Sequence, residues 1–239
     1  EGLHLIWEFH HILCDGWSAG LVLDEVVRVA NGAVLAETAT SFRQYLGWHR
    51  AQDSEATAAY WKQLLDGFGQ PTPLSLPQAS ASTDFRAGQH IETIGEVGLS
   101  AVQSFARSQR VTLNTLVQAA WALVQSVYSG SDDVIFGVTT SGRPAELPDV
   151  QSIVGMFLNT LPMRVPVTPH TSVPQWIESV QQQQLASGEH ASASLAELHR
   201  QVGLAVGDNL FDTVLIFENF PVPQPDGVPE KMVVTNKTV

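Results

Sequence analysis

The chain has 239 residues, of which 44% are hydrophobic and 15% are charged, a balance typical of a folded protein with a sizeable core. Its net charge of −12 provides no basic patch to neutralise phosphates, which argues against nucleic acid as a partner. A single cysteine excludes an internal disulfide and fits a cytoplasmic protein, and no apolar run is long enough to span a membrane.

The first predicted element is a strand that delivers two adjacent histidines. Apolar and polar residues alternate from Gly2 to Phe9, with the period of two that is typical of a strand. His10 and His11 follow directly, and Asp15 and Gly16 then turn the chain. A carboxylate near an imidazole can orient the ring or stiffen its loop, so this run predicts proton-transfer chemistry.

Plainer interpretations of the same run remain open. Adjacent histidines are common in ordinary cores, and an Asp-Gly pair is common in ordinary turns. Neighbouring strand residues point to opposite faces, so His10 and His11 cannot easily share an ion, and we expect no metal site. Cys14 can be interpreted as a nucleophile or as a small packed residue. We favour packing, because a nucleophilic cysteine needs a partner that lowers its pKa.

The rest of the chain mixes helices and strands. Helical spacing of apolar residues predicts helices at 19–29, 41–50, 54–65, 100–110, 112–128, 171–187 and 194–201. Ser18, Asn114 and Ser172 are the expected capping residues of three of them, and Pro174 is tolerated in a first turn. Further strands are predicted at 89–97, 133–140, 154–167 and 211–217. Without strict βαβ alternation, this order indicates an α+β fold.

Four segments, in order, resemble the motifs of the condensation domains of nonribosomal peptide synthetases. The HHxxxDG run comes first, and the later matches are Tyr60–Leu65, Ile135–Pro144 continuing into Val154–Pro162, and Leu210–Pro221. This ordered set covers nearly the whole chain. The resemblance implies two chloramphenicol-acetyltransferase-like lobes that meet at a tunnel.

On this reading the lobes occupy residues 1–66 and 89–239, and the Pro- and Gly-rich stretch 67–88 is the linker between them. A domain of this family would begin before the HHxxxDG strand and continue past a strand that starts near Met232. We therefore expect both lobes to be truncated here, and the chain alone to be inactive.

The implied activity is peptide-bond formation by an acyltransferase-type enzyme of secondary metabolite biosynthesis. A donor aminoacyl or peptidyl thioester reacts with an acceptor aminoacyl amine, and both are tethered to the phosphopantetheine arms of upstream and downstream peptidyl carrier domains. An adenylation domain is the expected neighbour, and the domain itself binds no cofactor. By motif position, His11 handles the amine proton, while His10 packs or hydrogen-bonds away from the tunnel.

The other candidate residues have two interpretations each. Asp15 orients His11 or forms a structural ion pair with Arg143, and we favour the ion pair. Gly16 offers its amide to the thioester oxygen or is an ordinary turn glycine. Trp17 and Asn219 are candidates for facing the tunnel. The alternative interpretations are that Trp17 is a core residue and that Asn219 is an ordinary turn asparagine.

Three alternative functions share parts of this pattern. They are an epimerisation domain, another HHxxxDG acyltransferase, and a non-catalytic platform that recruits carriers. Gly142–Glu146 does not resemble the glycine- and histidine-containing sequence of epimerisation domains, and the HHxxxDG motif is intact, so we favour condensation. One family motif does deviate, because Gly188–Ser194 lacks the usual His-Gln-Asp form, and we interpret His190 as a surface or loop residue rather than a second base.

Overall fold

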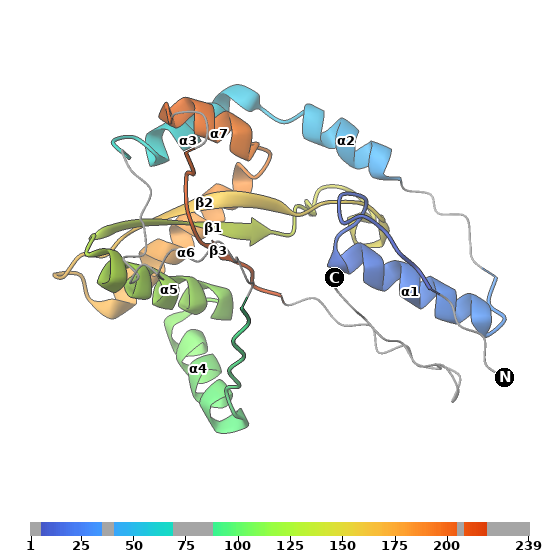
Figure 1. The fold of residues 1–239 in the computed structure, drawn as a ribbon, viewed down its shortest axis with the longest axis horizontal. Coiled ribbons are helices and arrows are strands. Elements are labelled where there is room, and N and C mark those ends of the chain that lie inside the picture. The colour runs from blue at the N-terminus through green and yellow to red at the C-terminus, as the bar shows by residue number, and fades with distance from the viewer. Residues whose placement is uncertain (1–5, 35–40, 69–87, 205–207, 219–239) are drawn as a thin grey trace. The chain divides into compact units, whose positions relative to one another are not determined.

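The computed structural model describes residues 6–34, 41–68, 88–204 and 208–218 (Figure 1). By internal packing the chain forms two compact units. Unit 1 comprises Glu1–Gln52, Ser141–Leu158 and Glu218–Val239, and unit 2 comprises Asp53–Thr140 and Asn159–Phe217. These units divide the chain at other positions than the predicted lobes, whose boundaries stay a prediction.

Unit 1 contains helix α1 (Gly16–Ala30), helix α2 (Phe42–Arg50) and the short 3-10 helix η1 (Val150–Ser152). Its small apolar core consists of Val150, Ile153 and Phe157, with aromatic residues of α2 packed against it. Because both α2 rings in this core contact the ring of Phe157, the 150–158 segment is held by side chains far away in sequence.

Unit 2 is built on a three-stranded sheet of order β2-β1-β3. Strand β1 (Asp133–Thr140) has the bounds that its apolar, β-branched run predicts, and it pairs antiparallel with β2 (Asn159–Pro166). Strand β3 (Val214–Leu215) pairs parallel with β1. Both β2 and β3 are shorter than predicted. For β2 the reason is that residues 154–158 belong to unit 1, where the amide of Phe157 bonds to Asp15 instead of a strand.

Two layers of helices cover the sheet of unit 2 (Figure 1). One face packs against α5 (Leu113–Ser129) and α6 (Val173–Glu189), and α4 (Glu96–Gln109) lies beside α5. The other face packs against α3 (Ser54–Leu64) and α7 (Leu195–Val202). Alternation along β1 explains both cores: Val134, Phe136 and Val138 face the first layer, and Ile135 faces the second.

Two predicted strands are wrong over the residues that the structure describes. Residues 6–10 and 88–95 form no strand, and α4 already begins at Glu96. Both segments carry apolar residues in alternation, yet Ile6 is 89% exposed and Ile91 is 74% exposed. Alternation makes a strand only where a neighbouring strand supplies hydrogen-bond partners, and neither segment has one among the described residues.

Two predicted helix caps are also wrong. Helix α1 begins at Gly16, and its N-cap is Asp15, whose carboxylate accepts a hydrogen bond from the backbone of Ser18. Helix α5 is capped by Thr112, not Asn114. The Ser172 cap of α6 is confirmed by position, with Pro174 in the first turn. Most of the predicted linker, residues 69–87, lies outside the described residues.

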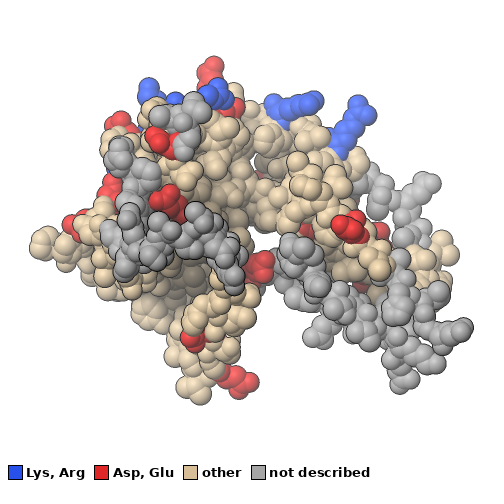
Figure 2. Space-filling model, in the orientation of Figure 1, with Lys and Arg blue, Asp and Glu red and all other residues tan. Residues whose placement is uncertain are grey.

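No helix in the described part of the chain combines the length and hydropathy needed to cross a membrane. On the face that Figure 2 presents, the Lys and Arg side chains of the described residues are few.

Candidate active site

The two histidines lie in a turn that leads into α1. The amide of Leu13 donates to the carbonyl of His10 over 3.0 Å, and the amide of Ile12 donates to His10 Nδ1 over 3.1 Å. Because Nδ1 accepts this bond, the neutral His10 ring carries its proton on Nε2. The side chain of His11 is exposed and has no hydrogen bond to any described residue. The turn thus engages the imidazole of His10, whereas the imidazole of His11 makes no hydrogen bond within the part of the chain that the structure describes.

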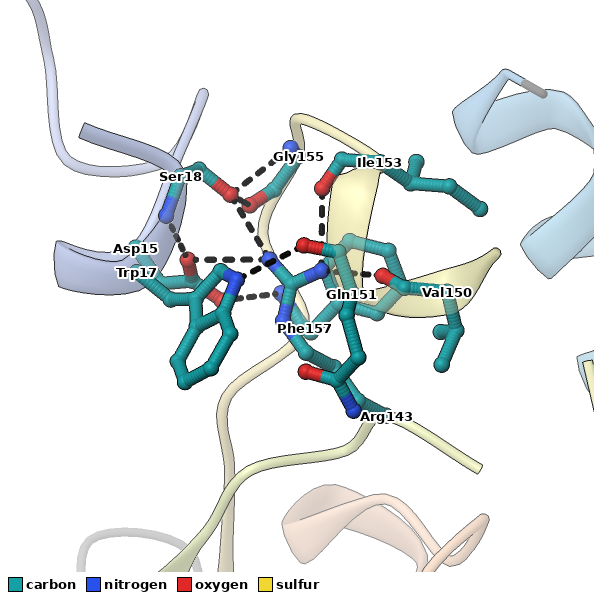
Figure 3. A network of polar contacts seen from close by, with 9 residues as sticks. All are labelled: Asp15, Trp17, Ser18, Arg143, Val150, Gln151, Ile153, Gly155 and Phe157. Carbon is teal, nitrogen blue, oxygen red and sulfur yellow. Dashed lines mark hydrogen bonds and ion pairs between the residues drawn. The ribbon is translucent and has the colours of Figure 1, made fainter. Parts of the chain in front are cut away.

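Asp15 follows this turn and is 3% exposed. Its Oδ1 accepts from the amide of Ser18 at 2.8 Å and from Nη2 of Arg143 at 3.4 Å, and its Oδ2 accepts from the amide of Phe157 at 3.2 Å. No hydrogen bond joins this carboxylate to His11 in the described residues. The structure therefore brings Asp15 together with Arg143 and not with the histidine (Figure 3).

Arg143 fills the centre of the network in Figure 3, and its side chain is 3% exposed. Nη1 donates to the carbonyls of Val150, at 2.5 Å, and Ile153, at 2.9 Å, while Nη2 donates to Asp15 and Ser18. Burial lowers the pKa of the Arg143 guanidinium, and the Asp15 carboxylate raises it. The group stays charged, since an arginine guanidinium keeps its proton at any ordinary pH. A planar guanidinium suits this site because its donors form a fixed fork.

Aromatic rings pack against the guanidinium of Arg143. Its carbon lies 3.9 Å from the ring centroid of Phe157 and 5.7 Å from that of Trp17. The Trp17 indole N–H donates a hydrogen bond to the carbonyl of Gln151 over 2.8 Å, so the Trp17 ring belongs to the same hydrogen-bond network as Arg143. Burial raises the pKa of the Tyr45 phenol, which packs on Phe157, and nearby Arg143 lowers it. The Trp17 ring is thus a half-buried part of the anchor, and the proposal that it faces a tunnel stays a prediction.

Two glycines let the backbone close around these residues. Gly142 has φ +58°, and a Cβ there would overlap the carbonyl of Phe157. A Cβ on Gly155 would collide with the ring of Phe42. Both positions therefore require glycine for a steric reason.

The remaining motif residues have simple environments. Cys14 is buried, and burial, followed by the nearby Asp15 charge, raises the pKa of its thiol, the opposite of what a nucleophile needs. Gly16 is the first residue of α1, where backbone N–H groups have no partner within the helix. Asn219 lies outside the described residues. No three His, Cys, Asp or Glu side chains gather as a metal site would require in the described part of the chain.

The segment that departs from the family motif lies within unit 2. His190 is half buried and stacks on Tyr60, with ring centroids 4.4 Å apart. The Trp61 indole N–H donates to the carbonyl of His190 over 3.0 Å. Asn159 Nδ2 donates to the carbonyls of Ala191 and Ala193. These contacts fix the segment to α3 and β2. His190 is the C-cap residue of α6 and lies in the turn that follows the helix, in line with its interpretation as a loop residue, but its ring is packed and half buried.

Sequence reasoning missed part of the site. Ser18 was predicted to cap a helix, whereas its hydroxyl is buried at 0% exposure and bonds to Gly155 and Arg143. The backbone carbonyls that Arg143 binds carry no side-chain signal, so no pattern could have revealed them.

A family model described as "Condensation domain" matches residues 1–235. A linear gramicidin synthase of Brevibacillus parabrevis is 39% identical over 95% of this chain and 5% of its own length. Chondramide synthase cmdD of Chondromyces crocatus is 38% identical over 92% of this chain and 6% of its own. The chain thus spans a small part of these curated relatives.

Solved structures agree on the fold. The first condensation domain of the calcium-dependent antibiotic synthetase, with a substrate analogue, superimposes with a TM-score of 0.70 at 22% identity, over 88% of this chain and 48% of that one. A four-domain nonribosomal peptide synthetase bound to AMP and glycine gives 0.71 at 19% identity, over 87% of this chain and 16% of that one. The predicted α+β, chloramphenicol-acetyltransferase-like fold class is confirmed. The chain belongs to the condensation-domain family of nonribosomal peptide synthetases.

Proposed function

We propose that this chain takes part in amide-bond formation between a carrier-tethered acyl donor and a carrier-tethered aminoacyl acceptor. The acceptor nitrogen attacks the donor thioester carbonyl, a C–N bond forms, and the C–S bond breaks to release the carrier's thiol. The observation that carries the proposal is the HHxxxDG turn. There the His11 side chain is exposed and bonds to none of the described residues, while a buried ion pair, Asp15–Arg143, holds the base of the turn.

His11 is the residue proposed to handle the proton. Attack requires a neutral amine, and an α-amino group with an ordinary pKa of about 8 is partly deprotonated at neutral pH. A general base contributes typically ~10²–10⁴-fold, whereas orientation can reach effective molarities of ~10⁵–10⁸ M. Positioning is therefore the larger contribution. His11 accepts or steers the amine proton, which then goes to the leaving thiolate.

His10 and Asp15 have supporting parts in this proposal. His10 Nδ1 is engaged by the amide of Ile12, which favours His11 as the imidazole free to meet the substrate. Asp15 acts as an anchor, because its oxygens are shared among Ser18, Phe157 and Arg143. A carboxylate that oriented a catalytic imidazole would need a bond to it.

Gly16 is proposed to stabilise the oxyanion. Its backbone N–H lies in the first turn of α1, where N–H groups are unpaired within the helix and the helix dipole favours negative charge. The thioester oxygen gains negative charge as the amine attacks, so a donor at this point stabilises the transition state more than the ground state.

The partners follow from the same chemistry. Peptidyl carrier domains upstream and downstream deliver both substrates on phosphopantetheine arms, and an adenylation domain is the expected neighbour. The domain itself is proposed to bind no cofactor. The support is the synthetase identity of the relatives and the four-domain synthetase among the structural neighbours.

The test uses the protein that contains this chain, here called the parent protein. Donor- and acceptor-loaded carriers are mixed with it, and the amide product is quantified by mass spectrometry. The proposal expects an amide that joins the two substrates. Inversion of the donor's α-carbon without an amide would indicate an epimerisation domain, and carrier binding with neither reaction would indicate a recruiting platform. Transfer of the donor to a free alcohol or amine would indicate another HHxxxDG acyltransferase.

A further inference from the structure

The Ser18 hydroxyl uses its whole hydrogen-bonding capacity inside the buried network. It donates to the carbonyl of Gly155 at 2.8 Å, and it accepts from the amide of Gly155 at 3.0 Å and from Arg143 Nη2 at 2.9 Å. A hydroxyl has one donor and two acceptor positions, so all three are occupied at 0% exposure. A residue needed only to cap or fill a helix has no reason to make this set of bonds.

These bonds connect the histidine turn to the Arg143 site. The Gly155 carbonyl that accepts from Ser18 also accepts from the amide of Asp15 at 3.2 Å, at the end of the turn that carries His11. Gly155 is thus hydrogen-bonded both to Ser18 and to Asp15. Figure 3 shows its bonds to Ser18. A shift of Gly155 would move the amide of Asp15, and with it the base of the turn.

We propose that Ser18 is a positioning residue, which holds the His11 turn in its reactive geometry by clamping Gly155 and completing the coordination of Arg143. The inference rests on the proposed function for its effect on rate, and on the contacts alone for its effect on the turn. Replacing Ser18 with alanine keeps nearly the same volume but leaves N–H groups of Gly155 and Arg143 without a partner in a buried place.

The experiment compares variants of the parent protein in two readouts. The first is single-turnover amide formation at saturating loaded carriers, together with the apparent affinity for each carrier. The second is hydrogen exchange at the amides of Asp15 and Gly155, which needs no activity. For Ser18→Ala we expect a rate lower by roughly ten- to a hundredfold, as small misplacements of a reacting group can cause, with carrier affinity unchanged. Both amides should exchange faster.

A control variant separates positioning from stability. Val27 is buried on the same helix, away from the polar network, so Val27→Ala loosens packing but leaves the network's hydrogen bonds in place. It should leave the single-turnover rate of the folded protein unchanged. Ser18→Thr, which keeps the hydroxyl, should recover most of the rate. If Ser18→Ala is not obtained folded, Ser18→Cys, with a weaker donor and acceptor of similar size, should give an intermediate rate.

The outcomes distinguish the two proposals. A wild-type protein that forms no amide would contradict the proposed function, while the exchange at Asp15 and Gly155 would still test the clamp. A Ser18→Ala variant with unchanged rate and unchanged exchange, or one that behaves like Val27→Ala in both readouts, would overturn the positioning role.

Discussion

Replacing Arg143 with methionine tests the anchor of the histidine turn. Methionine keeps much of the apolar stem but removes the guanidinium, which leaves the buried Asp15 carboxylate without its cationic partner. The carbonyls of Val150 and Ile153 also lose their donor. Removing one partner of a buried ion pair costs about 3–5 kcal/mol.

The structure points to the lower end of this range. Asp15 retains bonds from the amides of Ser18 and Phe157 in the variant, so its charge is not fully uncompensated. A loss of about 3 kcal/mol in local opening free energy corresponds to a roughly hundredfold faster exchange. The amides that report it are those that bond within the network, namely Asp15, Ser18, Gly155 and Phe157.

The assay is hydrogen–deuterium exchange on the parent protein, with Arg28→Met as the matched control. Arg28 pairs with Asp24 on the surface of α1 at 4.0 Å, with side chains 56% and 44% exposed. Such pairs contribute about 0–1 kcal/mol, so the control should change exchange little. If Arg143→Met and Arg28→Met exchange alike at the four amides, the anchoring account is wrong.

Two further predictions concern neighbouring residues. Gly142→Ala should loosen the 150–158 segment, because the new Cβ overlaps the carbonyl of Phe157 at a positive φ. Gly130→Ala is the control, since Gly130 also has a positive φ but open space around it. Equal thermal stability of the two variants would refute the steric argument. Cys14 should react slowly with iodoacetamide at pH 8, because the raised pKa of its thiol lowers the thiolate fraction below that of an ordinary thiol. The rise of the reaction rate with pH should therefore come at a higher pH than for free cysteine. A rate at pH 8 equal to that of free cysteine would contradict this.

The sequence predicted elements best where the local residue pattern and the long-range pairing favour the same structure. Residues 133–140 are such a case, because their β-branched run favours a strand and an antiparallel strand with matching apolar residues pairs with it. The alternation at 89–97 was equally strand-like, but no described strand lies beside it. Residues 154–158 continue the apolar run of β2, yet the Phe157 amide bonds to a carboxylate 142 positions away. Pairing with distant chain is what a local pattern cannot show.

In the candidate site, too, some residues could be predicted from local sequence and others depend on contacts with distant parts of the chain. The motif indicated His10, His11 and Asp15 directly, and the resemblance suggested Arg143 as the partner of Asp15. Ser18 was misread because a serine before a helical run has the local features of a cap, and so does an aspartate three positions earlier. Which of the two caps the helix depends on Gly155, 137 positions further along.

The most direct test of the central claim is the single-turnover rate of amide formation in His11→Ala and His10→Ala variants of the parent protein, at saturating donor and acceptor carriers. If His11 handles the amine proton while His10 is engaged in the turn, His11→Ala should lose ~10²–10⁴-fold in rate and His10→Ala distinctly less. A His11→Ala variant at the wild-type rate, or a larger loss in His10→Ala, would contradict the account.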